Sequence, residues 1–278
     1  MKITRNQSEL DNALKEMRKN GKIIGFVPTM GALHDGHLSL IKKAKKEADI
    51  VVVSIFVNPT QFSANEDLDK YPRTEESDIE KLSDQKADIV YLPSKEDIYP
   101  ENFSTKISTG KIGQDLEGIS RPHFFDGVAL IVTKLFMQVR PDIAIFGEKD
   151  YQQLHIIKNL VRDLNMPIKI IGGQIIREKN GLAMSSRNKY LSDSSLEKAS
   201  YIYKTILKAK ELLESGESEK KVTSWAESEL LKQGFEKVDY LQIRDNETLL
   251  PLSNETKEKR LLVAAYLDGV RLIDNIQL

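Results

Sequence analysis

Two histidines mark the point at which a β-like run of the chain gives way to a helical one. His34 and His37 lie in the segment VPTMGALHDGHLSLIKKA, residues 27–44. On a helix they fall on one face, and Gly36 between them lets a ligand approach the backbone. A helix N-terminus attracts phosphate, and an imidazole can donate a hydrogen bond to a phosphoryl oxygen as charge develops. The segment predicts a nucleotide-phosphate site; surface or capping histidines are the alternative.

A second segment, FGEKDYQQ (residues 146–153), also follows a predicted strand. Gly147 ends that strand, and Lys149 and Asp150 lie where the next helix begins. The lysine can neutralise phosphate, and the aspartate could hold ribose hydroxyls or a metal-bound water. Gln153 lies one turn further on, on the same side. An ordinary capping turn is the alternative, because aspartate is a good N-cap.

Two further polar segments are candidates. In GLAMSSRNKYL (residues 181–191) two hydroxyls precede a guanidinium, a combination that suits polyphosphate. A flexible polar linker is the alternative. In FVNPTQF (residues 56–62) the neutral amides of Asn58 and Gln61 could bind a hydroxy acid, and an Asn-Pro turn is the alternative.

Apolar periodicity predicts the elements that position these segments. Helices are expected over residues 8–19, 37–46, 75–84, 127–139 and 150–164, and strands over 22–27, 49–57, 87–93, 142–147 and 168–173. Pro28 is expected to end the first of these strands, and residues 94–125 carry no clear pattern. Strands that alternate with helices indicate an α/β fold with a doubly wound parallel sheet. Ligands of such sheets bind beyond the carboxyl ends of the strands.

The pattern changes near residue 176. Ser194 and Glu197 have the spacing of a capping box before a helix that runs to about Glu214. Another helix is expected near 218–232, followed by the strand-like runs KVDYLQI, RLLVAAYL and VRLIDNIQL. We therefore expect two domains, residues 1–176 and a smaller α+β domain of residues 177–278. His155 is expected on a helix surface and Trp225 in the packing of the smaller domain.

The composition excludes several classes of function. The 278 residues carry a formal net charge of −1, so no overall field favours nucleic acid or an anionic membrane, and neither is an expected partner. The absence of cysteine rules out zinc–thiolate sites and thiol nucleophiles and fits a reducing compartment. The N-terminus lacks the apolar core of a signal peptide, and a cytoplasmic protein is expected. No G-x-S-x-G elbow and no convincing metal-ligand spacing is present.

Taken together, PTMGALHDGH, FVNPTQF, FGEKDYQQ and MSSRN resemble the pantothenate synthetase family of the H-x-G-H adenylyl-transfer superfamily. That family joins pantoate to β-alanine with ATP, and the resemblance spans essentially the whole chain. It implies a Rossmann-like N-terminal domain that binds nucleotide and pantoate, a small C-terminal lid, a homodimer and Mg²⁺ with ATP. The family usually reads R-P-x-H-F-x-G, whereas residues 121–127 read RPHFFDG, with the histidine one position early. Arg121 is expected to help position substrate.

By position, the resemblance implies roles for individual residues. Charge on the reacting phosphates would be stabilised by His34, His37, Lys149 and Arg187. Gln61 would contact pantoate and then β-alanine, and Gln153 would be a second pantoate contact. The ATP contacts would be Met30, Gly31, Ala32, Leu33, His34, Asp35, Gly36, His37, Gly147, Glu148, Lys149, Asp150, Ile176, Met184, Ser185, Ser186 and Arg187. Direct metal ligands are not indicated.

The implied reaction has two steps. The carboxylate of pantoate attacks the α-phosphate of ATP to give pantoyl adenylate, and the amine of β-alanine then displaces AMP. Three alternatives share the H-x-G-H segment or its ATP chemistry: a nucleotidyltransferase acting on a phosphorylated acceptor, a class I aminoacyl-tRNA synthetase, and a nucleotide-binding regulator without turnover. The nucleotidyltransferase would not need NPTQF or KDYQQ, and the chain has no obvious basic anticodon-binding module.

Overall fold

The computed structural model describes residues 1–62 and 71–278. The contacts within it divide the chain into two compact units. The first comprises Met1–Glu148 and Ile156–Gln174, and the second comprises Lys149–His155 and Ile175–Leu278. The change of unit at residues 148–149 falls within the FGEKD segment. The lid and nucleotide-binding roles expected of the two domains stay predictions.

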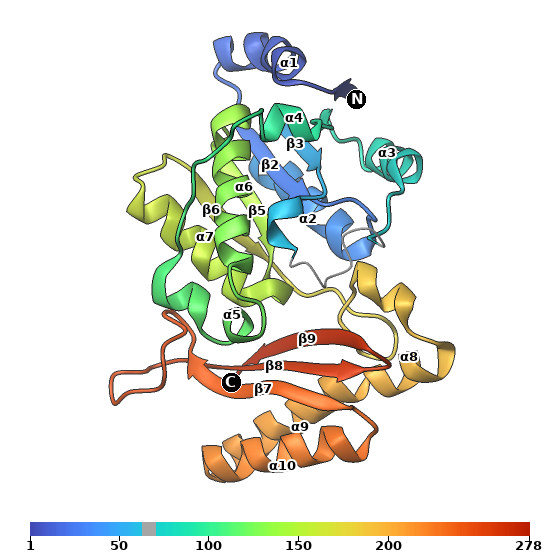
Figure 1. Ribbon diagram of the computed structural model, residues 1–278, viewed down its shortest axis with the longest axis vertical. Coiled ribbons are helices and arrows are strands. Elements are labelled where there is room, and N and C mark those ends of the chain that lie inside the picture. Colours follow the sequence, from blue (N-terminus) through green and yellow to red (C-terminus); the bar gives the residue numbers. More distant parts are fainter. Residues whose placement is uncertain (63–70) are drawn as a thin grey trace. The chain divides into compact units, whose positions relative to one another are not determined.

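The first unit is built on a six-stranded sheet in which every paired strand is parallel (Figure 1). Its strands, in spatial order, are β1 (Lys2–Thr4), β4 (Ile89–Tyr91), β3 (Ile50–Ile55), β2 (Ile24–Thr29), β5 (Ile143–Gly147) and β6 (Lys169–Gly173). This order confirms the predicted doubly wound α/β fold. The sequence did not predict β1, which has three residues and lies at the edge beside β4.

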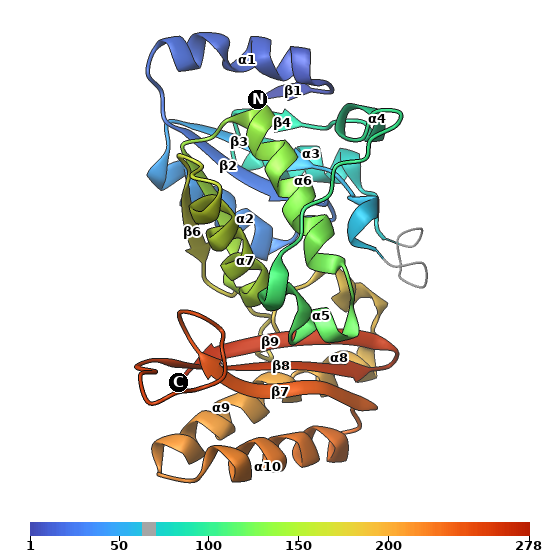
Figure 2. The same ribbon diagram turned by 60° about the vertical axis from the view of Figure 1, so that its left-hand side comes forward.

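Helices cover both faces of this sheet because neighbouring residues of a strand point to opposite sides. The helices are α1 (Gln7–Lys19), α2 (Asp35–Glu47), α3 (Glu75–Asp84), α6 (Phe124–Val139) and α7 (Tyr151–Asp163). Val27 of β2 packs with Ile41 of α2 and Leu82 of α3. Its neighbour Phe26 meets the ring of Phe136 on α6, edge to face at 6.3 Å. Figure 2 shows α6 running across the sheet.

The chain reverses its direction of winding at β2, and this places the expected ligand site. β3 lies on one side of β2 and β5 on the other, so the two neighbours of β2 come from separate halves of the winding. Pairing between β2 and β5 covers only Gly25 and Phe26 and stops before the carboxyl end of β2. Ligands of such sheets bind beyond the strand ends at this point of reversal.

Pro28 does not end β2, and that expectation is wrong. It lies inside the strand opposite Ser54 of β3. The carbonyl of Thr29 accepts a hydrogen bond from the N–H of Phe56 at 3.0 Å, so Thr29 faces β3 and Pro28 faces the other side. On that side the pairing with β5 has already ended at Phe26. Pro28, which has no N–H, therefore removes no hydrogen bond from the pairing between β2 and β3.

The segment 94–125, which had no predicted assignment, contains short helices. They are α4 (Lys95–Ile98), a 3-10 helix at Gly110–Gln114 and α5 (Glu117–Ser120), and α6 begins at Phe124 instead of 127. Contacts between separate parts of the segment and with the start of α6 hold them. Asp126 accepts hydrogen bonds from the N–H and the hydroxyl of Thr109, both at 2.8 Å. Gly118 lies so close to Gly113 that a Cβ on Gly118 would be 2.0 Å from the carbonyl oxygen of Gly113.

The second unit is a small α+β structure, as the sequence predicts. Its antiparallel sheet has the order β7 (Lys237–Asp245), β8 (Lys259–Leu267) and β9 (Val270–Gln277), and its longer helices are α8 (Asp193–Ala199), α9 (Tyr201–Glu214) and α10 (Glu219–Lys232). Figure 2 shows α9 and α10 side by side along this sheet. Trp225 packs against the hydrophobic core of this unit, as expected.

Two local expectations for the second unit are wrong. Ser194 lies inside α8 and does not cap it. Ser192 is the N-cap, because its hydroxyl accepts a hydrogen bond from the N–H of Ser195 at 3.3 Å. His155 is buried, with 6% of its surface exposed, because its ring packs against that of Tyr151 at 4.8 Å.

No helix in the described ranges, 1–62 and 71–278, is both long and apolar enough to cross a bilayer.

Replacing Gly127 by alanine should destabilise the first unit. A Cβ at this position would lie 2.3 Å from the carbonyl oxygen of Thr60, and backbone on both sides leaves no flexible atom to move. We expect Gly127→Ala to lower the free energy of unfolding by about 1–3 kcal/mol, the usual cost of overpacking. Urea unfolding measures it. Gly147→Ala is the matched control, since its nearest neighbour would be Leu40 at 3.9 Å. Equal stability of the two variants would contradict the close approach.

Candidate active site

Helix α2 begins at a cap made by the two histidines. His34 is the N-cap, and its Nδ1 accepts a hydrogen bond from the N–H of Gly36 at 3.2 Å. Nδ1 of His37 accepts from the N–H of His34 at 3.4 Å, and the two rings lie 4.2 Å apart. A ring nitrogen that accepts carries no proton, so each neutral imidazole holds its proton on Nε2. Each ring is thereby a hydrogen-bond donor at Nε2.

A buried carboxylate from α3 holds the turn before this cap. Asp78 is fully buried and accepts hydrogen bonds from the N–H groups of Ala32 and Leu33, both at 2.8 Å. Lys81, one turn further along α3, donates to the carbonyl of Leu33 at 2.9 Å. Gly31 has a φ of +82°, and a Cβ there would lie 3.1 Å from Asp78. Glycine is therefore needed both for the backbone conformation and for space.

Gln61 lies beside Met30, which follows β2. Gln61 belongs to a 3-10 helix, Pro59–Gln61, after β3. Its Oε1 accepts a hydrogen bond from Nδ2 of Asn58 at 3.2 Å, and its Nε2 donates to Sδ of Met30 at 2.8 Å. Arg121 donates to the main-chain carbonyl of Gln61 at 3.3 Å. The structure thus joins two predicted substrate contacts and gives Arg121 a place beside them.

Asn58 organises this corner from a buried position, with 1% of its surface exposed. Its Oδ1 accepts hydrogen bonds from the hydroxyls of Tyr99 at 2.8 Å and Thr60 at 3.0 Å, and its Nδ2 also reaches the carbonyl of Gly127 at 3.2 Å. Burial raises the pKa of Tyr99, so its phenol stays protonated and remains a donor. The amide of Asn58 therefore acts mainly as a fixed support for Gln61.

The early histidine of RPHFFDG does not face this corner. His123 is the N-cap of α6 in a left-handed conformation, and 89% of its side chain is exposed. Arg121 lies flat on the ring of Phe124 at 3.6 Å and pairs with Glu117 at 3.3 Å. The segment therefore acts on Gln61 through Arg121 and not through its histidine.

In the second unit, Lys149 is held through its main chain. Its carbonyl accepts a hydrogen bond from Nδ2 of Asn275 on β9 at 3.0 Å. Its ammonium lies 3.9 Å from the carboxylate of Asp150, which is about half exposed. Gln153 is half-buried in the first turn of α7. Side chains of both charges thus follow the end of β5, as the sequence predicts.

Ile176 and Met184 face each other across a turn in the second unit. The N–H of Met184 donates to the carbonyl of Ile176 at 2.9 Å, and Arg177 forms an isolated antiparallel bridge with Ala183. The turn needs Gly181, which has a φ of +96°. The alternative of a flexible linker does not hold for this segment, because its backbone is paired across the turn.

The hydroxyl of Ser185 then starts a 3-10 helix, Ser186–Tyr190, by accepting a hydrogen bond from the N–H of Arg187 at 3.3 Å. Asn188 is buried and donates to the carbonyl of Ala183 at 3.1 Å, which fastens this helix to the preceding turn. Ser185, Ser186 and Arg187 therefore sit on an ordered support.

Comparison with known proteins decides the family. A sequence model of the pantoate-β-alanine ligase family matches residues 2–277. The chain belongs to this family. It is 46% identical over 276 residues to a pantothenate synthetase of Thermosipho africanus, covering 99% of both chains. It is 49% identical over 269 residues to one of Aquifex aeolicus, covering 96% of this chain and 95% of that one.

Solved structures of this family share the whole fold. A pantothenate synthetase of Thermus thermophilus superposes with a TM-score of 0.94 at 41% identity, covering 100% of this chain and 99% of that one. A pantoate-β-alanine ligase of Francisella tularensis, solved in complex with β-γ ATP and β-alanine, superposes with a TM-score of 0.85 at 38% identity, covering 100% and 97%. The chain is therefore an enzyme of the ligase class.

The predicted ligand contacts of this pantoate-β-alanine ligase family member are divided between the units. The first unit holds Met30, Gly31, Ala32, Leu33, His34, Asp35, Gly36, His37, Gln61, Gly147 and Glu148, and the second holds Lys149, Asp150, Gln153, Ile176, Met184, Ser185, Ser186 and Arg187. Sequence analysis did not single out Asp78 or Asn275. Asn275 stands in a strand with several apolar residues, which is a weak signal, whereas Asp78 stands in a mostly polar helix, EESDIEKLSD, and carries no signal of its own.

The residues present fit a magnesium ion only through the nucleotide. Within residues 1–62 and 71–278, no group of three or more histidine, aspartate or glutamate side chains is placed to hold a metal ion. Mg²⁺ usually binds through substrate phosphates, water and one or two carboxylates. Asp150, half exposed beside Lys149, is the carboxylate among the predicted ATP contacts that suits this arrangement.

Removing the charge of Asp78 should loosen the turn before the histidine cap. In Asp78→Asn, an amide N–H₂ would face one of two N–H groups or the hydroxyl of Thr74, which leaves buried donors unsatisfied. We expect a loss of about 1–3 kcal/mol in the free energy of unfolding and weaker ATP binding, measured by urea unfolding and calorimetry. Asp84→Asn, exposed on the same helix, is the control. Unchanged ATP affinity in Asp78→Asn would refute the role of this clamp.

Proposed function

We propose that this chain condenses pantoate with β-alanine in an ATP-dependent reaction through a pantoyl adenylate, releasing AMP and pyrophosphate. The observation that carries the proposal is the cap at the start of α2, in which Nδ1 of His34 and of His37 each accept a main-chain hydrogen bond. It follows the strand at which the sheet reverses, in a member of this family. The Francisella tularensis relative, with β-γ ATP and β-alanine bound, supports the choice of substrates.

The first step makes the carboxylate reactive. A carboxylate oxygen of pantoate attacks the α-phosphorus of ATP, the bond from that phosphorus to the bridging oxygen breaks, and pyrophosphate leaves. Negative charge grows on the phosphoryl oxygens and on the leaving group. His34 and His37 donate from Nε2 to these oxygens without having to change protonation state. Because the donors are already oriented by the cap, little reorganisation is needed in the transition state.

Lys149 and Arg187 supply positive charge to the same phosphates from the second unit. Ser185 and Ser186 add hydroxyl donors, and a guanidinium can bind two phosphate oxygens at once. Mg²⁺, held mainly by the nucleotide and by Asp150, would further neutralise the triphosphate. The remaining ATP contacts, from Met30 to His37 and at Gly147, Glu148, Ile176 and Met184, shape the pocket around the nucleotide.

Gln61 positions the acid and then the amine. Its carboxamide is held by Asn58 and Met30, so it can present a neutral amide to pantoate without binding the carboxylate too tightly to react. Gln153 is the second pantoate contact. Once pyrophosphate has left, the amine of β-alanine attacks the acyl carbon of the adenylate near Gln61. The bond from that carbon to the AMP oxygen breaks, and the nitrogen loses a proton as the amide forms.

Three further properties belong to the same proposal. The second unit acts as a lid that keeps water from the mixed anhydride, which would otherwise hydrolyse. The enzyme works as a homodimer. It acts in the cytoplasm, a reducing compartment that suits a chain without cysteine because no disulfide has to form.

The order of product release tests the proposal. Incubated with ATP, Mg²⁺ and pantoate, the enzyme should form at most one equivalent of pyrophosphate per site and release no AMP, because the adenylate stays bound. Addition of β-alanine should start steady release of AMP and pantothenate. Quenched-flow assays with labelled ATP measure both products. AMP formation that does not require β-alanine, or rapid turnover with a phosphorylated acceptor instead, would reject this function.

Two substitutions of His37 separate its role in the cap from its role in catalysis. His37→Asn keeps an acceptor near the N–H of His34 but removes the Nε2–H donor, whereas His37→Ala removes both. We expect the adenylation rate to fall by about 10²–10³-fold or more in both variants, with the melting temperature of His37→Asn closer to that of the wild type. Pyrophosphate bursts and thermal unfolding provide the two measurements. Near-normal adenylation in His37→Asn would remove the assigned role.

A further inference from the structure

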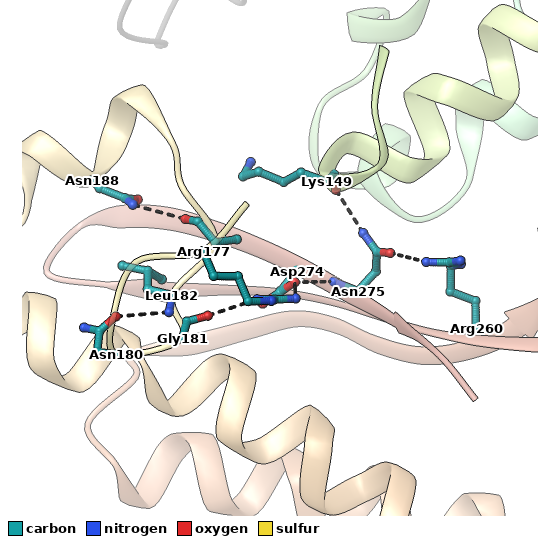
Figure 3. A network of polar contacts seen from close by, with 10 residues as sticks. Lys149, Arg177, Asn180, Gly181, Leu182, Asn188, Arg260, Asp274 and Asn275 are labelled. Atoms are coloured by element: carbon teal, nitrogen blue, oxygen red, sulfur yellow. Dashed lines mark hydrogen bonds and ion pairs between the residues drawn. The ribbon is translucent and has the colours of Figure 1, made fainter. Parts of the chain in front are cut away.

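Two adjacent polar residues of β9 lie buried in a strand that is otherwise apolar on its covered positions. Asp274 and Asn275 each have 2% of their surface exposed, and they follow Leu272 of the hydrophobic core of this unit. Burying a carboxylate and an amide is costly unless both are fully hydrogen-bonded. Both are, and Figure 3 shows the contacts that they make.

Asn275 links Lys149 to the sheet in one orientation only. Its Oδ1 accepts a hydrogen bond from Nη1 of Arg260 at 2.6 Å, so its Nδ2 must point the other way, toward the carbonyl of Lys149 at 3.0 Å. Arg260 is itself fixed, because its guanidinium lies 3.7 Å from the ring centre of Tyr151 and its Nε donates to Asn246 at 2.8 Å. The amide therefore cannot turn without losing two hydrogen bonds.

Asp274 links the turn after Ile176 to the same strand. Arg177 donates to both of its carboxylate oxygens, at 2.6 and 2.9 Å, and also to the carbonyl of Gly181 at 3.0 Å. The guanidinium lies on the ring of Tyr203 at 3.6 Å. Burial raises the pKa of Asp274, and the pairing with Arg177 opposes this. The two-point contact with a guanidinium holds the carboxylate in one orientation.

The two contacts are joined by one short strand segment. The main-chain N–H of Asn275 donates to Oδ1 of Asp274 at 2.8 Å, so the carboxylate and the amide hold each other in place. Lys149 on one side and the turn before Met184 on the other are thereby fastened to neighbouring positions of β9 (Figure 3). These are the two segments of the second unit from which the proposed function draws its phosphate contacts.

We propose that Asn275 is a positioning residue for catalysis, which acts by fixing the main chain of Lys149, and that Asp274 does the same for the segment leading to Arg187. The inference rests on the proposed function for the roles of Lys149 and Arg187. Neither Asp274 nor Asn275 contacts substrate in this scheme. They fix the main-chain positions from which the side chains of Lys149 and Arg187 extend. A displacement of a catalytic group by about 1 Å can cost about 100-fold in rate.

Asn275 gives the cleaner test, because loss of the buried Asp274–Arg177 pair could unfold the unit. Asn275→Asp keeps an oxygen for Arg260 and removes the donor to Lys149, and Asn275→Ala removes both contacts. Gln277→Ala on the same strand is the matched control, since Gln277 is exposed and its amide binds Glu258. Each variant is made in the wild type and in Lys149→Ala, in which the carbonyl remains but the ammonium is gone.

In the wild-type background we expect both Asn275 variants to lower kcat/KM for ATP in the pyrophosphate-forming step by about 10- to 100-fold. In the Lys149→Ala background the further loss should be less than about 3-fold, because the two residues act through one contact. Thermal unfolding of Gln277→Ala should match that of the wild type. Asn275→Asp should unfold at a lower temperature, because it buries a second carboxylate beside Asp274, so all rates are measured at a temperature at which every variant is folded. Losses that multiply in the double variants, or wild-type rates in both Asn275 variants, would overturn the inference.

Failure of the proposed function gives a different pattern from failure of this inference. If the wild type forms no pantothenate but binds ATP in calorimetry, the function is wrong, and the same variants are compared by their ATP dissociation constants. Weaker binding in Asn275→Asp that vanishes in the Lys149→Ala background supports the positioning role, and equal binding overturns it. A wild type that binds no ATP overturns both proposals.

Discussion

The reciprocal cap of helix α2 is the constraint on which the rest of the site depends. Two backbone N–H groups at the start of the helix need acceptors, and Nδ1 of each histidine supplies one. This satisfies the helix and at the same time fixes the proton of each ring on Nε2. The same requirement explains the turn between β2 and α2, since the cap can form only if this turn brings His34 and His37 to the start of the helix. Gly31, with its positive φ, allows the turn, and the two hydrogen bonds that Asp78 accepts from Ala32 and Leu33 hold it.

The change of unit within FGEKD is the second constraint. Gly147 ends a strand of the parallel sheet, whereas the carbonyl of Lys149, two residues later, is bound to β9. The predicted phosphate contacts therefore come from two separately packed bodies, with neutral donors from the first and the lysine and arginine from the second.

The sequence predicted those features that are repeated over several residues or carried by a long motif. The buried strands at 50–55 and 143–147 are continuous apolar runs, and the helices between them show regular spacing. The segment 94–125 could not be predicted, because its one-turn helices depend on contacts such as that of Asp126 with Thr109. The effect of Pro28 could not be predicted, because it depends on which neighbouring strand the backbone of β2 faces at that residue. The capping serine was misplaced by two positions because several serines stand together at 192–195.

Supporting residues escaped prediction for a physical reason. Asp78, Arg177 and Asn275 each hold a predicted ligand-binding segment by its main chain, through N–H groups of Ala32 and Leu33 or carbonyls of Gly181 and Lys149. A main-chain contact places no demand on the identity of the residue that is held, so no motif joins the two positions. It does fix the direction of the Cα–Cβ bond and leaves the polar atoms of the side chain to the ligand. Hydrogen bonds of this kind gain strength where water is excluded. A site supported in this way keeps its donors oriented before substrate arrives, and preorganisation of that kind is what stabilisation of a phosphoryl transition state requires.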